Sequence, residues 1–214
     1  KCCIAKAVGK CIINGDVVLH NCGSMLPFVG QLMFWCIGAE ILTINVHALS
    51  KQVMNKDNPQ AILMKNLHIT DILFGLYFCS MAFADVYFDN EFALNQKWWE
   101  NNEICQILSL VTFASILASP LMEAAIALER LCHIVLVGDS PWPGNKGTIF
   151  ICCCVWTVCG GVSSAVVMGS ERSSDNYLCL AINFFSGNFE VWPLIFVILL
   201  CADVISVAAI ALSS

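Results

Sequence analysis

The chain has 214 residues, of which 58% are hydrophobic and only 12% are charged, and its formal net charge is −6. Soluble globular domains carry about 25% charged residues. A chain of this length with half that share cannot solvate the surface of a soluble domain, and the mean hydropathy of +0.77 agrees. The composition therefore indicates an integral membrane protein.

The apolar residues gather into five blocks, at 26–49, 61–84, 104–136, 148–169 and 190–212. A hydrocarbon core of about 30 Å requires roughly 20 helical residues, and each block is long enough to cross it. Strands of a transmembrane barrel would be shorter and would alternate in polarity, which these blocks do not. We therefore predict an all-α, multi-pass transmembrane helical bundle.

The segment before the first span, residues 1–25, contains four of the cysteines: Cys2, Cys3, Cys11 and Cys22. It is too short to bury a core of its own. We divide the chain into this cysteine-rich N-terminal segment and one membrane domain at 26–214.

The connection between the second and third spans is acidic. From Asp85 to Glu103 it holds five acidic residues against Lys97 alone, whereas the loop after the first span carries Lys51 and Lys56. By the positive-inside rule the acidic connection lies outside the cell. Three lysines before the first span weigh against this orientation, because they would then lie outside as well. Trp98 and Trp99 lie where an aromatic belt at the membrane interface is expected, and the alternative is contact with a ligand.

The third span carries the most specific pattern. Cys105 opens it and Glu129-Arg130 closes it, and the 25 intervening steps correspond to about 37 Å of helix, one full membrane crossing. Further marks follow in order along the chain: Asn45 in the first span, Asn66-Leu67 and Asp71 in the second, Ser119 in the third, Trp156 in the fourth and Cys179 in the loop after it. Together these motifs resemble the rhodopsin-like (class A) G-protein-coupled receptors.

Within that class the chain is similar to the leucine-rich-repeat-containing receptors, which include the glycoprotein-hormone, relaxin and R-spondin receptor groups. The similarity lies in Trp98-Trp99-Glu100-Asn101, in Leu178-Cys179-Leu180, in Asp71 with Gly75-Leu76-Tyr77, and in Cys2-Cys3. It implies that 1–25 is a hinge-like segment and that 26–214 holds the first five helices of a seven-helix receptor. Leu131 departs from the family, which usually has tyrosine or tryptophan there, and we expect a chain truncated before the sixth span and lacking the repeat ectodomain.

The resemblance implies two sites at the ends of the third span. Cys105 and Cys179 form a disulfide, for which the alternative is two unpaired thiols. Glu129 and Arg130 form a local ion pair whose arginine engages the G protein. The alternative is that this pair only ends the helix, with its side chains reaching the membrane interface.

The resemblance also implies a sodium site, with Asp71 as the charged ligand beside Asn45 and Ser119. A carboxylate in mid-membrane is costly, by roughly 3 kcal/mol, and indicates a function. The alternative is a neutral Asp71 hydrogen-bonded to Asn45. Trp156 has a structural role, and sodium is the sole cofactor expected.

Glu123 is unusual, because the family has an apolar residue there. It shares one helix stripe with Ser119 and Arg130, which we expect to face the interior of the bundle. Two interpretations remain open: a carboxylate that binds Arg130 or loosens the resting state, and a protonated side chain held by a hydrogen bond. Pro120 is expected to kink the helix.

No constellation of nucleophile and base is found, so we predict a receptor and no enzyme. A complete relative would lie in the plasma membrane with its N-terminus extracellular. Its partners would be lipid, a heterotrimeric G protein and a secreted protein ligand bound by the ectodomain, with a receptor oligomer and without nucleic acid. The alternatives are a small ion or proton transporter using Glu40, Asp71, Glu123 and Asp203, and a non-signalling membrane scaffold.

Overall fold

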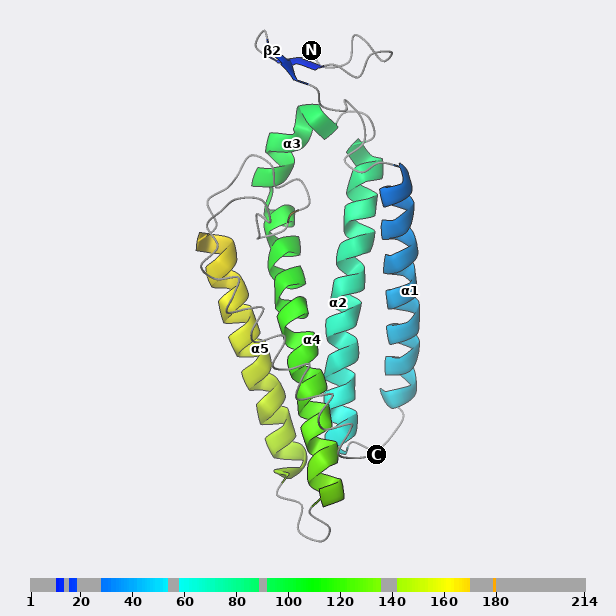
Figure 1. Cartoon of the computed structure of the whole chain (residues 1–214), viewed down its shortest axis with the longest axis vertical. Helices are drawn as coiled ribbons and strands as arrows, with labels where there is room; N and C mark the ends of the chain where they lie inside the picture. The colour runs from blue at the N-terminus through cyan, green and yellow to red at the C-terminus, as the bar shows by residue number, and fades with distance from the viewer. Residues whose placement is uncertain are drawn as a thin grey trace.

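The computed structural model describes residues 11–13, 16–18, 28–53, 58–88, 92–135, 142–169 and 179. Their elements follow in chain order: β1 (Cys11–Ile13), β2 (Asp16–Val18), α1 (Phe28–Val53), α2 (Pro59–Phe88), α3 (Phe92–Asn101), α4 (Glu103–Val135) and α5 (Gly144–Gly169). The helices α1, α2, α4 and α5 have 26 to 33 residues each. They run roughly side by side (Figure 1).

The four long helices are the first four predicted spans. Each is long and apolar enough to cross a membrane, so the prediction of a multi-pass helical bundle is confirmed. α2 begins two residues before the predicted 61–84 and ends four residues after it, and α5 begins four residues before the predicted 148–169. The predicted span at 190–212 lies outside the described residues.

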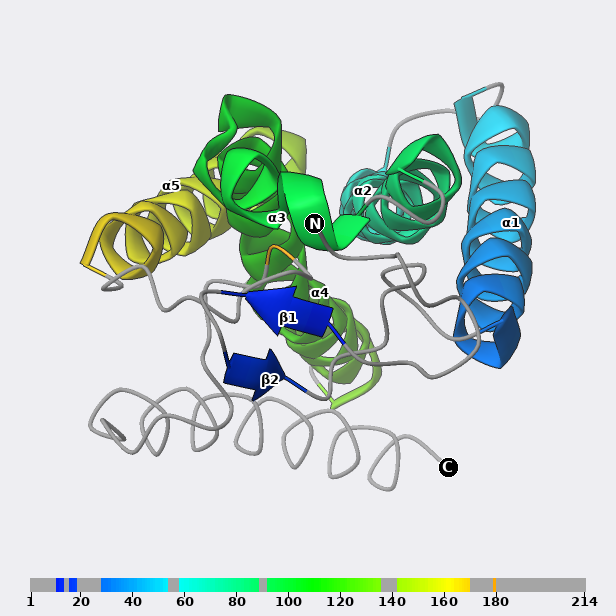
Figure 2. The ribbon, with the colours of Figure 1, turned by 90° about the horizontal axis from the view of Figure 1, so that it is seen from above.

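The long helices follow the order α1, α2, α4, α5 across the bundle, and α2 contacts each of the other three. It packs against α1 on one side and against α4 on the other, and α4 packs in turn against α5 (Figures 1 and 2). We call the end of the bundle at which α2 ends and α4 begins the disulfide end. The opposite end, where α2 begins and α4 ends, is the Arg130 end.

Glycines allow α1 and α2 to approach closely. A Cβ atom added to Gly38 would lie 2.7 Å from Cys79 Sγ and 3.1 Å from the backbone nitrogen of Cys79. One added to Gly75 would lie 3.0 Å from Ile41 Cγ2 and 3.1 Å from Leu42 Cγ. Small residues at a helix contact let the backbones come together, which is how helices associate in lipid.

Asparagines begin two of the helices. Asn58 precedes α2, and its Oδ1 accepts a hydrogen bond from the backbone nitrogen of Ala61 at 2.7 Å. Asn102 separates α3 from α4, and its Oδ1 accepts from the backbone nitrogen of Ile104 at 2.9 Å. A side-chain oxygen at this position satisfies one of the free N–H groups of the first helical turn.

The connection from 85 to 103 differs from the acidic loop expected from the sequence. α2 continues to Phe88, and α3 occupies Phe92–Asn101. The ten-residue helix α3 is too short and too polar to be predicted as a membrane span. The sequence therefore indicated only the acidic charge of this connection and not the helix. The N-terminal segment contains β1 and β2, which pair antiparallel with Cys11 opposite Val18. These two strands are the exceptions to the all-helical fold within the described part of the chain.

Candidate functional site

The disulfide end is closed by a covalent bond. Cys105, in the first turn of α4, is bonded to Cys179, which is 74 positions further along the sequence, and their Cα atoms are 5.1 Å apart. Both cysteines are buried and pack in one cluster with Tyr77, Phe88 and Trp99. The predicted disulfide is therefore present, and the aromatic side chains of α2 and α3 surround it.

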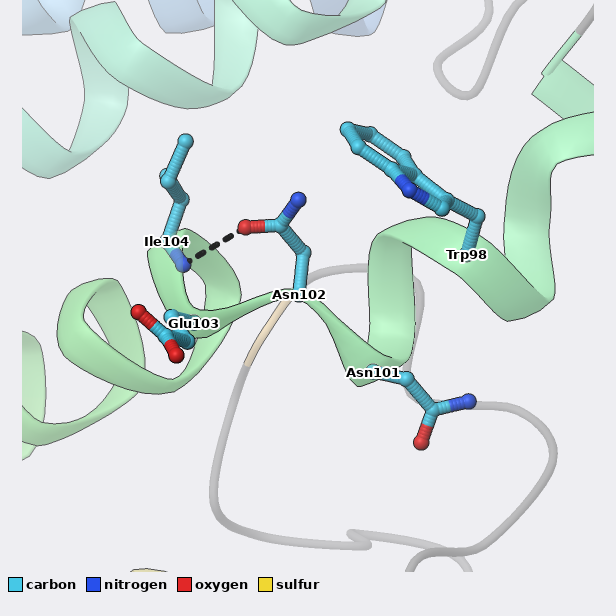
Figure 3. Close-up of a pocket in the computed structure, with 5 residues that line it drawn as sticks. All are labelled: Trp98, Asn101, Asn102, Glu103 and Ile104. Carbon is cyan, nitrogen blue, oxygen red and sulfur yellow. Dashed lines mark hydrogen bonds between the residues drawn. The ribbon is translucent and has the colours of Figure 1, made fainter.

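A shallow, open concavity lies beside this cluster, where α3 meets α4 (Figure 3). It is lined by Trp98, Asn101, Asn102, Glu103 and Ile104. Trp98 is 58% exposed there, whereas its neighbour Trp99 is 5% exposed. One of the two tryptophans predicted for the aromatic belt therefore belongs to the core, and the other faces outward beside polar groups.

Asp71 and Ser119 meet between α2 and α4. The hydroxyl of Ser119 donates to Asp71 Oδ1 at 3.3 Å. This contact brings together two of the three residues predicted for the sodium site. The alternative interpretation, a neutral Asp71, expected a hydrogen bond with Asn45. The observed partner of Asp71 is Ser119.

Asn45 makes its hydrogen bonds elsewhere. Its Oδ1 lies 2.7 Å from Nδ1 of His68, and its Nδ2 donates to the carbonyl of Ile41 at 3.0 Å. Nε2 of the same histidine lies 3.4 Å from Nε2 of Gln52. The predicted group of Asn45, Asp71 and Ser119 is thus divided: Asn45 belongs to the contact of α1 with α2, and the other two residues belong to the contact of α2 with α4.

Trp156 connects helices that are distant in sequence. Its indole Nε1 donates to Asn66 Oδ1 at 3.1 Å, across 90 residues, and its ring packs beside the cluster of Leu63, Met122 and Ile126. Asn66 also donates to the carbonyl of Ile62 at 2.9 Å. This contact between α5 and α2 is consistent with the structural role expected for Trp156.

At the Arg130 end the predicted pair is separated. Glu129 is buried, with 3% exposed, and its Oε1 lies 3.1 Å from Nε2 of His133, one turn further along α4. Arg130 is exposed and reaches α2 instead. With the Gln60 amide oriented to satisfy both groups, its oxygen accepts from Arg130 Nη2 at 3.0 Å and from Nε at 3.1 Å. Sequence reasoning missed Gln60 and His133, because neither residue type marks such a contact by itself.

Glu123 is exposed in these helices, as is Arg130, whereas Ser119 is half-buried. The stripe that the three residues share is thus partly covered by α2 and is otherwise open over the described helices. Glu40 is exposed on α1, and Asp203 lies outside the described residues. Within the described ranges no three His, Cys, Asp or Glu side chains gather to hold a metal ion.

The helices thus combine a disulfide at one end of α4, polar pairs between neighbouring helices and an exposed arginine at the other end of α4. Residues 40–213 match the family model of the 7 transmembrane receptor (rhodopsin family), and the chain belongs to that family. This match favours the receptor over the transporter.

Several curated receptors are similar to the chain. The G-protein coupled receptor GRL101 of Lymnaea stagnalis is 24% identical over 85% of this chain and 17% of its own length. The leucine-rich repeat-containing G-protein coupled receptor 5 of Bos taurus is 24% identical over 76% of this chain and 18% of its own length. The relaxin receptor 1 of Homo sapiens is 20% identical over 82% of this chain and 23% of its own length.

The chain thus spans about a fifth of the length of these relatives. The predicted resemblance to class A receptors of the leucine-rich-repeat group is confirmed. The chain is a transmembrane part of a G-protein-coupled receptor and a multi-pass membrane protein.

Proposed function

We propose that the chain belongs to a plasma-membrane receptor that receives a secreted protein signal at its disulfide end and couples to a heterotrimeric G protein at its Arg130 end. The observation that carries the proposal is the construction of α4. One helix long enough to cross the bilayer is fixed by a disulfide at its start and presents an exposed arginine near its end. The similarity to receptors, and not to enzymes, supports a signalling role without catalysis.

The proposed orientation places the disulfide end and the N-terminus outside the cell. A disulfide forms and persists in an oxidising compartment, which supports an external position for Cys105 and Cys179. Lys51 at the end of α1 and Lys146 near the start of α5 are both exposed at the opposite end, where the positive-inside rule expects them. Glycosylation mapping tests this. An acceptor sequence inserted before Phe28 should be glycosylated and one inserted at 136–141 should not, and the reverse pattern would overturn the orientation.

The sodium ion remains a proposal, for which Asp71 and Ser119 are the protein ligands. A carboxylate and a hydroxyl supply the oxygen atoms that a hard cation prefers. Asn45, the third predicted ligand, is hydrogen-bonded to His68 and does not fit this set as the helices stand. When bound, the ion would neutralise the carboxylate of Asp71 within the membrane.

G-protein coupling is tested in cells that express the protein from its complete transcript. We expect association with a labelled G protein, measured by energy transfer, and its loss in Arg130→Ala at equal surface expression. Lys146→Ala, which removes another exposed cation at the same end, is the matched control and should retain the signal. Unchanged association in Arg130→Ala would contradict the role of the arginine. Absence of association in the unmodified protein would favour the non-signalling scaffold.

A further inference from the structure

Glu40 places a carboxyl group in the middle of the membrane on an exposed side of α1. It is the central residue of the span Phe28–Gln52, so each end of the span lies about 18 Å away along the helix. Its side chain is exposed at this depth, where the surroundings of the bundle are hydrocarbon. An ionisable group in mid-membrane is costly and nearly always pairs with another polar group. The position of Glu40 therefore calls for a partner.

The helices around Glu40 do not supply this partner. The positions three and four residues away on α1 hold cysteine, isoleucine and threonine, which carry no positive charge, and His47 is two turns distant. Among the described elements α1 packs against α2 alone, and it lies at the edge of the bundle (Figure 2). Gly38 faces α2, and at about 3.6 residues per turn Glu40 points to the other side of α1. Glu40 makes no ion pair within the described part of the chain.

The side of α1 that holds Glu40 is small and polar. We use the name Glu40 face for five exposed residues that share one direction of the helix: Cys36, Glu40, Thr43, His47 and Ser50. Thr43 Oγ1 donates to the carbonyl of Ala39 at 2.6 Å, and Ser50 Oγ donates to that of His47 at 2.7 Å. Both hydroxyls are thus satisfied within α1, whereas the carboxyl group of Glu40 is not.

The first turns of α1 differ from the Glu40 face. There the exposed residues are large and apolar, as contact with lipid favours: Phe28, Val29, Leu32 and Met33. On the Glu40 face, Cys36 and Thr43 lie one turn before and one turn after the carboxyl group. Small residues of this kind let the backbone of a second helix come close in lipid. The Glu40 face is therefore built for contact with a helix.

We propose that the Glu40 face binds a membrane helix of another protein that carries a lysine or arginine near its midpoint. Charge complementarity favours this partner. In a symmetric pair formed by two copies of the chain through this face, Glu40 would meet the same carboxyl group of the other copy, and like charges repel. A basic residue at the same depth forms an ion pair instead. The contact is on the side of α1 away from α2, so it is independent of the sodium site and of G-protein coupling.

The experiment measures binding of a designed helix to the full chain in phosphatidylcholine liposomes by energy transfer. The probe is a labelled membrane-spanning helix of leucine and alanine with one lysine at its centre, and its twin has leucine there. A central lysine reaches the depth of Glu40 whichever way the probe inserts, because Glu40 is itself central in its span. We expect the lysine probe to bind more tightly than its twin on the order of tenfold, the size of effect typical of polar contacts between membrane helices.

Three variants assign this preference to Glu40. Glu40→Gln keeps the shape of the side chain and removes its charge, and it should bind the lysine probe no better than the leucine twin. Glu123→Gln, at another exposed carboxylate of a span, is the matched control and should retain the preference. Glu40→Lys should lose the lysine probe and bind a probe with a central glutamate. The unfolding temperature of each variant shows that it is folded.

Equal binding of the lysine probe and the leucine twin by the unmodified chain would overturn the inference. An equal loss of binding in Glu40→Gln and Glu123→Gln would also overturn it, because the preference would then not belong to α1. Self-association is measured with two differently labelled copies of the chain. If it depends on Glu40 while the lysine probe shows no preference, the face belongs to a second copy and the proposed partner is wrong. If Glu40→Gln does not fold, failure of Glu40→Lys to bind the glutamate probe overturns the inference.

Discussion

The two ends of α4 are held by different kinds of interaction. At the disulfide end a covalent bond lies within a buried cluster, and Phe88 contacts the rings of Trp98 and Trp99 with centroids 6.1 Å and 5.6 Å apart. At the Arg130 end the contacts are polar and partly exposed: Gln60 with Arg130, and His133 with Glu129. The disulfide end is therefore held in a fixed geometry, whereas the contacts at the Arg130 end can exchange partners, which the proposed coupling to a G protein requires.

Removing the disulfide should have the largest effect on stability. In the chain-entropy model, closing the loop between residues 74 apart contributes about 4 kcal/mol, so Cys105→Ser should greatly lower the unfolding temperature in nanodiscs. Cys179→Ser should match it, and the double variant should be no worse. Cys153→Ser, at an exposed free cysteine, is the control. A stable Cys105→Ser chain would show that the aromatic cluster alone fixes this end.

A side chain at Gly38 should have the next largest effect, because it disturbs the close packing of α1 against α2. Gly38→Val places atoms against the backbone of Cys79, and overpacking of this kind costs roughly 1–3 kcal/mol. Gly161→Val on α5 is the matched control, since a Cβ added there meets nothing within 4 Å. Equal losses of thermal stability in the two variants would mean that the close approach of α1 and α2 contributes little.

Substitution of Gln60 should alter coupling more than stability. Gln60→Ala removes hydrogen bonds to a partly exposed arginine, and a hydrogen bond to a charged group contributes about 1.5–3 kcal/mol at most. We expect the freed Arg130 to raise basal G-protein association. Gln60→Glu should lower it, because a carboxylate holds the guanidinium more strongly. The decisive result is that basal G-protein association changes in opposite directions in the two variants. A change in the same direction would contradict the role of Gln60.

His133→Ala should have the smallest effect on stability. His133 is the exposed partner of a buried carboxylate, and a single hydrogen bond of this kind contributes about 0.5–1.5 kcal/mol. Its removal leaves the carboxylate of Glu129 free to pair with Arg130, so basal association should fall, opposite to Gln60→Ala. Leu128→Ala, at another exposed position of α4, is the control. A rise in association would show that His133 does not keep Glu129 from the arginine.

The sequence alone predicted the features that depend on a pattern extending over many residues, such as the length of an apolar block or the order of several motifs. Block length located four spans, the order of Asp71, Cys105 and Cys179 indicated the family, and the resemblance to the family implied the disulfide. The helix α3 was missed because a ten-residue polar helix has no such pattern, and a single capping residue, Asn102, marks the start of α4 after it.

The partners of the polar residues could not be predicted for a different reason. They depend on how each helix is rotated about its axis, and a rotation by one residue exchanges one neighbour for another. Asn45 was expected to contact Asp71 but is hydrogen-bonded to His68. Arg130 was expected to pair with Glu129 but contacts Gln60. The family motif names the residues that are polar but not the pairs that they form in a particular chain.

The hydrogen bond from Trp156 to Asn66 has a consequence for how the protein is made. The two residues are 90 positions apart, so α2 leaves the ribosome long before α5 can supply the indole. At usual rates of synthesis this interval is on the order of ten seconds. During this interval the amide oxygen of Asn66 lacks the indole N–H of Trp156 as its hydrogen-bond donor. Synthesis of α5 supplies this donor, so the contact between α2 and α5 is among the last to form in this part of the chain.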